Sequence, residues 1–223
     1  MVTEKNTPNP ARDLVRIHKV ITRSLKVVIE RGADFHRTGF PNGEIRQGFI
    51  DYANCVAIVL ESHHLAEDDI FFPAMREKFP LAPYERLSAV HQEIQALLVP
   101  VRQAVADLNV QGNGNGLPLL VDTLRKIAEA WPPHMRMEES IFSAEALSEG
   151  MDPETLAGLS GAMGKFASEH SNPPYLTVPF ILFNLQPADR ALWLEHTPPA
   201  LMDEMVMKAW KDQWAPLKPF LLE

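Results

Sequence analysis

The sequence predicts an all-α protein, an up-down four-helix bundle with an additional helical, proline-rich C-terminal extension. First, apolar residues recur at the three- and four-residue spacing of a helix face through most of residues 1–150. Second, one pair of helical segments, with its own histidine and carboxylate pattern, occurs twice in that region. Third, proline-rich pieces such as SNPPYLTVPF separate short helical patterns after Gly150. We therefore expect a bundle over residues 1–150 and an extension over residues 151–223, which packs on the bundle or forms a homodimer contact.

Length, composition and charge argue against several classes of protein. The chain has 223 residues, of which 46% are hydrophobic, enough for a well-packed domain with an extension. Its net charge of -8 argues against nucleic acid or an anionic membrane as a partner. It contains no apolar run long enough to span a bilayer, and its first residues, MVTEKNTPNPARD, lack the basic and apolar regions of a signal peptide. We expect a cytoplasmic protein.

The first two helices are predicted from apolar spacing and from the turn between them. Apolar residues 14–28 follow one helix face, which predicts a helix over 11–31. The glycine-rich stretch GADFHRTGFPNG, starting at Gly32, is typical of a turn and should end this helix. A second helix should then run from about Glu44 and end before Pro80.

The third and fourth helices are separated by a glycine-rich loop. The third should run from about Pro83 to Asn109, because proline suits the first turn of a helix. QGNGNG then reads as a flexible loop, and Leu117-Pro118 opens the fourth helix. Prolines inside a helix remove hydrogen bonds and clash with the preceding turn. Trp131-Pro132-Pro133 therefore predicts a kink or break, with His134 at the start of the next helical segment.

The repeated unit is the most informative feature of the sequence. HHLAEDDIF, from His63, and HMRMEESIF, from His134, both read His-x-x-x-Glu-acid-x-Ile-Phe. Upstream of each lies a lone histidine, in LVRIH and in LSAVH. The two units offer six candidate metal ligands as two equal sets: His18, His63 and Glu67, then His91, His134 and Glu138.

The spacing of these residues suits a dinuclear metal site. Residues four apart on a helix lie on one face, with Cβ atoms about 5–6 Å apart, and helix bundles build dinuclear carboxylate sites in their cores. We expect Glu67 and Glu138 to bridge two metals, with one histidine pair on each metal. Cys55 is the only cysteine, so nitrogen and oxygen must hold the metals, which suits iron, manganese or zinc.

The register of the first motif needs a choice, because His64 and Asp68 also lie four residues apart. Aligning the repeats places His64 opposite Met135 and Asp68 opposite Glu139. We therefore choose His63 and Glu67 as the ligands of this motif. His64 could tune or shield the site, and whether it joins the ligands stays open. Asp68 and Glu139 should be supporting or surface groups.

The remaining histidines are weaker candidates. His170, in SEHSNPPY, lies at the start of the extension and could fold back to supply a further imidazole. His36 lies in a glycine-rich stretch and is expected to be solvated, and His196 is expected at a helix end.

The order of these residues resembles the hemerythrin-like family, specifically its HHE cation-binding domains, over roughly residues 11–147. Phe72-Pro73 after the first motif also matches the family pattern. The resemblance implies a four-helix bundle that holds two non-haem iron ions, bridged by two carboxylates and usually by an oxo or hydroxo group. Oxygen-carrying members have two histidines four residues apart on the third helix, whereas here His91 is followed by Gln95. Their last carboxylate is an Asp five residues after its histidine, whereas here it is Glu138 at four.

These departures favour reactive or sensing chemistry over reversible oxygen transport. We expect a di-iron protein that binds or reacts with dioxygen, peroxide or nitric oxide, in oxidative or nitrosative stress handling. Two alternatives stay open: a module that senses oxygen or iron, and a protein that binds or stores divalent metal without catalysis. No Gly-rich phosphate loop, Gly-x-Ser-x-Gly turn or Cys-x-x-Cys is present, so no residue is assigned a separate catalytic role.

Overall fold

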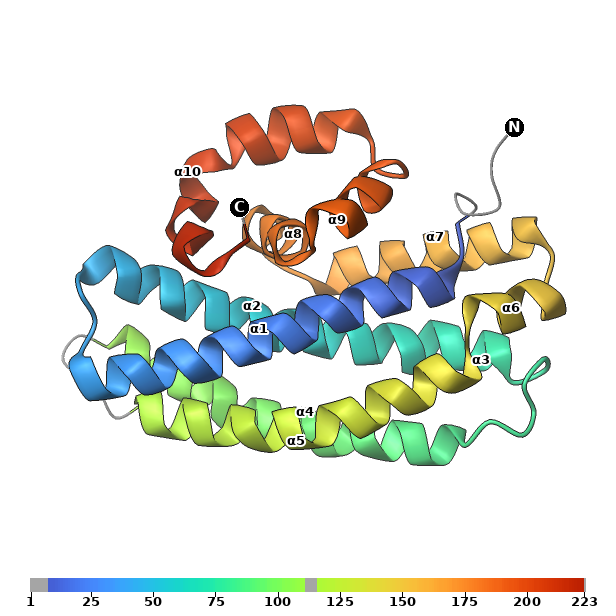
Figure 1. The fold of residues 1–223 in the computed structure, drawn as a ribbon, viewed down its shortest axis with the longest axis horizontal. Helices are drawn as coiled ribbons and strands as arrows, with labels where there is room; N and C mark the ends of the chain where they lie inside the picture. The colour runs from blue at the N-terminus through green and yellow to red at the C-terminus, as the bar shows by residue number, and fades with distance from the viewer. Residues whose placement is uncertain (1–7, 111–115, 223) are drawn as a thin grey trace.

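The computed structural model describes residues 8–110 and 116–222, and within these ranges it contains helices and no strands (Figure 1). The all-α prediction is confirmed. The four longest helices are α1 (Pro10–Thr38), α2 (Gly43–Ala66), α4 (Tyr84–Asn109) and α5 (Gly116–Ile141). Helix α1 packs against α2 and α5, and α4 packs against the same two helices, so the four enclose a common core. Among the described helices, none is long and apolar enough to cross a membrane.

The first helix is longer than predicted, because Gly32 does not end it. A Cβ atom at Gly32 would lie 2.8 Å from Val121 Cγ2 and 3.2 Å from the Phe49 ring, so the glycine allows close packing inside α1. The helix ends instead at Gly39, whose φ of 77° favours glycine. The Gly39 N–H donates to the Phe35 carbonyl at 2.9 Å.

We predicted a kink or a break in the fourth helix. The break is wrong, since α5 continues through Pro132 and Pro133, and His134 lies inside it rather than at the start of a new segment. The two prolines leave the carbonyls of Ala128 and Glu129 without their usual helical partners. Pro133 and Glu129 are exposed and Pro132 is partly exposed, so water can hydrate this outer face. The predicted loop over residues 111–116 lies, apart from Gly116, outside the described residues.

The second helix contains an irregular turn at the first motif. After α2, the chain forms the π-helical turn η2 (Glu67–Phe71) and then α3 (Phe72–Met75). The Glu67 N–H faces the carbonyls of both His63 and His64. A π turn holds one additional residue, so it rotates the side chains that follow it, and such turns are frequent at functional sites.

The C-terminal extension packs against α1 and α2. The short helix α6 (Ala144–Gly150) leads into it, and its elements are α7 (Pro153–His170), α8 (Pro174–Asn184), α9 (Pro187–Leu194), η3 (Leu201–Ala209), α10 (Lys211–Trp214) and η4 (Ala215–Phe220). Helices α7 and α8 and the turn η4 contact α2, on which Gly48 meets the backbone of Pro216. Figure 1 shows the later elements of the extension gathered over one side of the long helices. Helix α2 is thereby enclosed by the other long helices and by the extension.

A buried polar network joins the extension to the long helices. The Tyr52 hydroxyl donates to Asn184 Oδ1 at 2.6 Å, and Arg23 donates to the Tyr52 hydroxyl and to the Phe220 carbonyl, each at 3.0 Å. Tyr52 is fully buried and combines packing in the core with these hydrogen bonds.

Candidate metal centre

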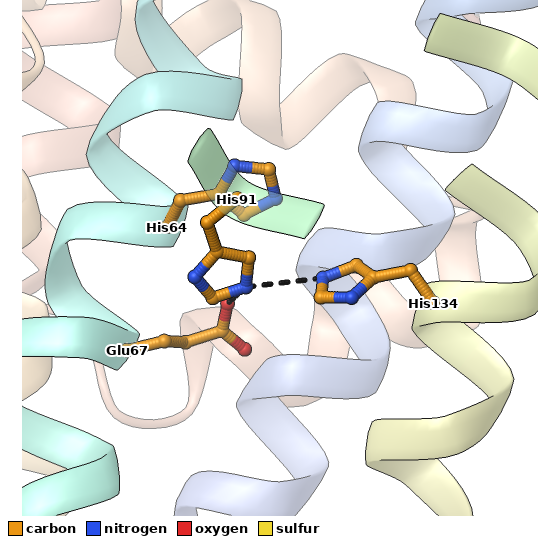
Figure 2. Close-up of side chains that lie close together, drawn as sticks. All are labelled: His64, Glu67, His91 and His134. Atoms are coloured by element: carbon orange, nitrogen blue, oxygen red, sulfur yellow. Dashed lines mark hydrogen bonds and ion pairs between the residues drawn. The ribbon is translucent and has the colours of Figure 1, made fainter. Parts of the chain in front are cut away.

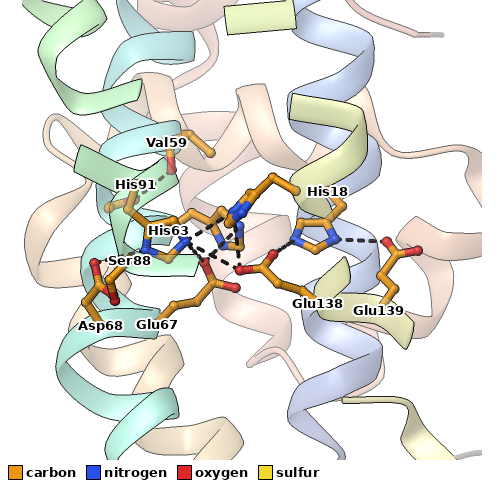
Figure 3. Close-up of polar contacts among 11 residues, drawn as sticks. His18, Val59, His63, Glu67, Asp68, Ser88, His91, Glu138 and Glu139 are labelled. Carbon is orange, nitrogen blue, oxygen red and sulfur yellow. Dashed lines mark hydrogen bonds and ion pairs between the residues drawn. The ribbon is translucent and has the colours of Figure 1, made fainter. Parts of the chain in front are cut away.

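The structure brings the six predicted ligands together in the middle of the four long helices (Figure 3). Their exposed fractions lie between 0% and 6%. Each long helix contributes at least one of them, with His18 on α1, His91 on α4, the His63 unit on α2 and η2, and the His134 unit on α5. That they ligate metal stays a prediction.

The first group of potential ligands contains His18, His63, Glu67 and Glu138. One ligand atom from each residue lies within 4.8 Å of the others. His18 Nε2 lies 3.3 Å from Glu138 Oε2, and His63 Nε2 lies 3.4 Å from Glu67 Oε2. This group joins the two residues of the predicted first histidine pair.

The second group contains His64, Glu67, His91 and His134, again with ligand atoms within 4.8 Å of one another (Figure 2). The Nε2 atoms of His91 and His134 lie 3.1 Å apart. His64 was not chosen as a ligand, yet its ring stacks on that of His91 at 4.1 Å between centroids.

Both glutamates lie between the two groups. Glu67 belongs to both of them, and its Oε2 is 3.4 Å from His63 Nε2 and 3.5 Å from His91 Nε2. Glu138 directs Oε1 toward His134 Nε2, at 3.2 Å, while its Oε2 faces His18. This is the placement that carboxylates bridging two cations require.

The acidic residue after each glutamate orients the lone histidine of the opposite unit (Figure 3). Glu139 Oε1 lies 2.9 Å from His18 Nδ1, and Asp68 Oδ2 lies 2.9 Å from His91 Nδ1. The Ser88 hydroxyl in turn donates to Asp68 Oδ1 at 2.6 Å. A carboxylate that accepts from Nδ1 leaves Nε2 free to face a metal and increases its basicity.

The cluster fits a cation because many of its buried polar atoms lack hydrogen-bond partners. Unpartnered atoms are Nε2 of His18 and His63, both ring nitrogens of His64, both carboxylate oxygens of Glu67, Nδ1 of His134 and Oε2 of Glu138. A buried polar atom left unsatisfied costs about 1–3 kcal/mol, and more when it is charged. Nitrogen and carboxylate oxygen donors of this kind satisfy iron, manganese or zinc.

Burial and neighbouring charges perturb the pKa values of the two glutamates in opposite directions. Burial, reinforced by the charges of Glu138 and Asp68, raises the pKa of Glu67 well above its ordinary range. For Glu138, burial acts to raise the pKa, but the adjacent imidazoles of His18, His91 and His134 outweigh it and lower the pKa. Glu67 is thus the carboxyl that most needs a cation to hold its ionised form.

The histidines also divide into two kinds. Burial lowers the pKa of His63 and His64 well below the ordinary range, and lowers that of His134 to about 4. Burial acts in the same direction on His18 and His91, but their carboxylate partners outweigh it and raise the pKa. The lowered pKa values of His63, His64 and His134 favour neutral imidazole, which is the form that ligates metals.

Trp131 closes one side of the cluster. Its ring is 1% exposed, and four imidazole rings surround it with centroids 5.2–6.0 Å away, those of His18, His63, His64 and His134. Trp131 Nε1 donates to the Thr22 hydroxyl at 2.9 Å. The outer side of the indole lines a surface pocket of about 260 Å³, together with Thr22, Leu25 and Pro132. One indole therefore separates this pocket from the histidines.

The remaining histidines lie away from the cluster. His170 is exposed, its Nδ1 lies 2.8 Å from the Phe166 carbonyl and its ring stacks on Phe166, so it does not supply a further imidazole. His36 is exposed, as expected, although it lies in the last turn of α1 rather than in a loop. His196 lies in the turn directly after α9, at the helix end where it was expected.

Trp131 and Ser88 were not predicted as part of the site, and His64 was not chosen as a ligand. The signal for His64 was the apolar character of α2 on nearly all sides, which indicates a helix enclosed by its neighbours. On such a helix, adjacent histidines both face the interior. For Ser88 we find no signal in the sequence.

The fold and the site together define an all-helical protein with a buried histidine and carboxylate cluster that could bind metal. The sequence model of the hemerythrin HHE cation-binding domain family matches residues 9–146, more than half of the chain. The protein therefore belongs to the hemerythrin HHE family, which confirms the resemblance carried by the repeated motif. No curated protein and no solved structure matches the chain.

Proposed function

We propose that the protein is a non-haem di-iron protein that binds or reacts with dioxygen, peroxide or nitric oxide in oxidative or nitrosative stress. The supporting observation is the position of the two glutamates. Glu67 belongs to both ligand groups, and the two oxygens of Glu138 face different groups, so two cations can lie side by side. We also infer that the four long helices have the up-down connection that the repeat predicts, in a cytoplasmic protein.

The residues around the cluster define what the chain contributes. Two iron ions would supply redox chemistry and positions for a small ligand. The histidines and glutamates hold the cations, while Asp68 and Glu139 fix the orientation of His91 and His18. Trp131 and Phe72, whose ring stacks on His91 at 5.5 Å, keep water away from the imidazoles. A diatomic molecule or peroxide is small enough for such an enclosed site.

Metal analysis combined with spectroscopy tests the proposal. Protein loaded with ferrous iron without oxygen should hold two irons per chain, and its visible absorption should change when peroxide or nitric oxide is added. Peroxide should be consumed faster than by the same amount of free iron. A colourless protein that holds only zinc, or no metal after iron loading, would contradict the proposal and favour a structural or storage role.

A sensing module is the second candidate, and one contact favours it. The Ser171 hydroxyl of the extension donates to the Ser62 hydroxyl at 2.9 Å, in a buried position beside His63. A change at the ligands of α2 would therefore reach the extension directly. If the protein is a sensor, adding the ligand to the iron form should alter the protease sensitivity of residues 151–223 without turnover of the ligand.

A further inference from the structure

We infer that His64 is a seventh metal ligand, which gives one metal position three imidazoles and the other position two. The inference rests on the proposed dinuclear centre and goes beyond it, because it distinguishes the two metals. It also replaces the equal ligand sets expected from the sequence repeat with an unequal pair.

The two adjacent histidines of α2 divide between the two groups. Successive residues on a helix point about 100° apart. The His63 ring lies 5.0 Å from the His18 ring, on the α1 side. The His64 ring lies 4.1 Å from the His91 ring and 5.5 Å from the His134 ring, on the side of α4 and α5 (Figure 2). Because α1, α4 and the extension bury α2 from different sides, both side chains face the interior.

His64 has no other partner that would explain its burial. The residue is 3% exposed, and neither Nδ1 nor Nε2 makes a hydrogen bond. One of its ring nitrogens lies within 4.8 Å of ligand atoms from Glu67, His91 and His134. A cation at the centre of that group satisfies the imidazole nitrogen that the protein leaves unpartnered.

The other repeat offers no equivalent of His64. The aligned residue, Met135, is partly buried, and its Sδ accepts a contact from the Thr22 hydroxyl at 3.8 Å. Gln95, which follows His91 by one helix turn, also stays outside the centre, since its amide donates to Glu61 at 2.6 Å. The third imidazole of the second position therefore comes from α2 and not from α4.

The two positions consequently differ in the metal that each one prefers. The first has two imidazoles, and the second has three, while Glu67 and Glu138 lie between the two positions. Imidazole favours zinc, cobalt and ferrous iron over manganese, whereas carboxylate oxygen suits manganese better. A metal such as zinc or cobalt should therefore fill the three-histidine position first.

The test compares His64→Met with Met135→Leu, two substitutions at equivalent positions of the repeat. Metal-free protein is titrated with zinc in a calorimeter and with cobalt(II) by visible absorption. Wild-type protein should show two steps of unequal affinity. His64→Met should weaken the tighter step at least tenfold and leave the other step in place, while Met135→Leu should behave as wild type. Circular dichroism checks that each variant is folded, and His64→Gln replaces His64→Met if the latter is not.

The outcomes separate this inference from the proposed function. Wild-type protein that binds neither cation nor iron would overturn both. Two indistinguishable steps in the wild type, or unchanged affinities in folded His64→Met or His64→Gln, would overturn the role of His64 and leave the dinuclear centre intact.

Discussion

Glu67 is the residue in which the demands of folding and of metal binding oppose each other most directly. Its carboxyl is fully buried, neither oxygen has a hydrogen-bond partner, and burial together with Glu138 raises its pKa. Without a cation, this residue destabilises the folded chain.

Substitution of Glu67 by leucine should therefore act in opposite directions with and without metal. Removing the unsatisfied carboxyl should stabilise the metal-free protein by about 1–3 kcal/mol, as measured by urea denaturation. The same change should lower metal occupancy at both positions together, because Glu67 belongs to both groups. Glu61→Ala on the same helix is the control, with occupancy unchanged. Destabilisation of metal-free Glu67→Leu would contradict the argument.

Asp68 acts on the site through His91, because its Oδ2 accepts a hydrogen bond from His91 Nδ1 at 2.9 Å. Asp68→Asn should lower metal affinity about 10–100-fold, the usual effect of losing such a partner, as measured by competition with a chelator. Asp69→Asn, one residue later and exposed, should have no effect. Equal affinities for the two variants would show that the hydrogen bond does not position His91.

Cys55 should be chemically inert in the folded protein. Burial, and to a smaller extent the charge of Asp51, raises the pKa of its thiol, and the residue is fully buried. Because the thiolate is the reactive form and the pKa is shifted upward, raising the pH from 7 to 9 should produce little of it. A disulfide reagent should therefore label Cys55 only after denaturant is added. Rapid labelling of native protein at pH 8 would contradict this.

At the scale of elements, the sequence predicted the helices well and their irregularities poorly. The ligands could be predicted because a four-residue spacing places two side chains on one helix face in any context. Gly32 was taken for a helix end, since its contact with Val121 depends on how α1 meets α5. His64 was not chosen as a ligand because comparing two repeats cannot identify a feature that only one of them has. The π turn that begins at Glu67 could not be predicted, because the local sequence contains no pattern that indicates it.

The unbroken α5 leads to a prediction about its exposed proline. Pro133→Ala restores an N–H that can bond within the helix, and an interior proline costs about 3 kcal/mol relative to alanine. The unfolded chain of the variant also gains conformational entropy, which offsets about 0.4–1 kcal/mol of this increase in stability. We expect the free energy of unfolding to rise by about 2 kcal/mol in urea denaturation. A loss of stability would favour the broken helix expected from the sequence.

At the scale of the whole molecule, the extension and the long helices form one packed unit through the contact of Gly48 with Pro216. A Cβ atom at Gly48 would lie 1.9 Å from the Pro216 carbonyl oxygen. Gly48→Ala should therefore force α2 and η4 apart and cost about 1–3 kcal/mol of stability. Gly43→Ala is the control on the same helix, because a Cβ there meets nothing within 4 Å. Thermal denaturation should separate the two variants, and equal midpoints would mean that η4 does not dock as described.

The enclosure of α2 also affects how a cation held by its residues would exchange with solvent. The helix and its π turn provide His63, His64 and Glu67, and they are covered by the other long helices on one side and by the extension on the other. A cation held there has no direct route to solvent while these layers stay closed. Its escape rate is then set by the free energy of local opening rather than by the strength of the metal bonds alone. Mutations in the distant extension would then change the lifetime of a bound cation without altering any of the residues that hold it.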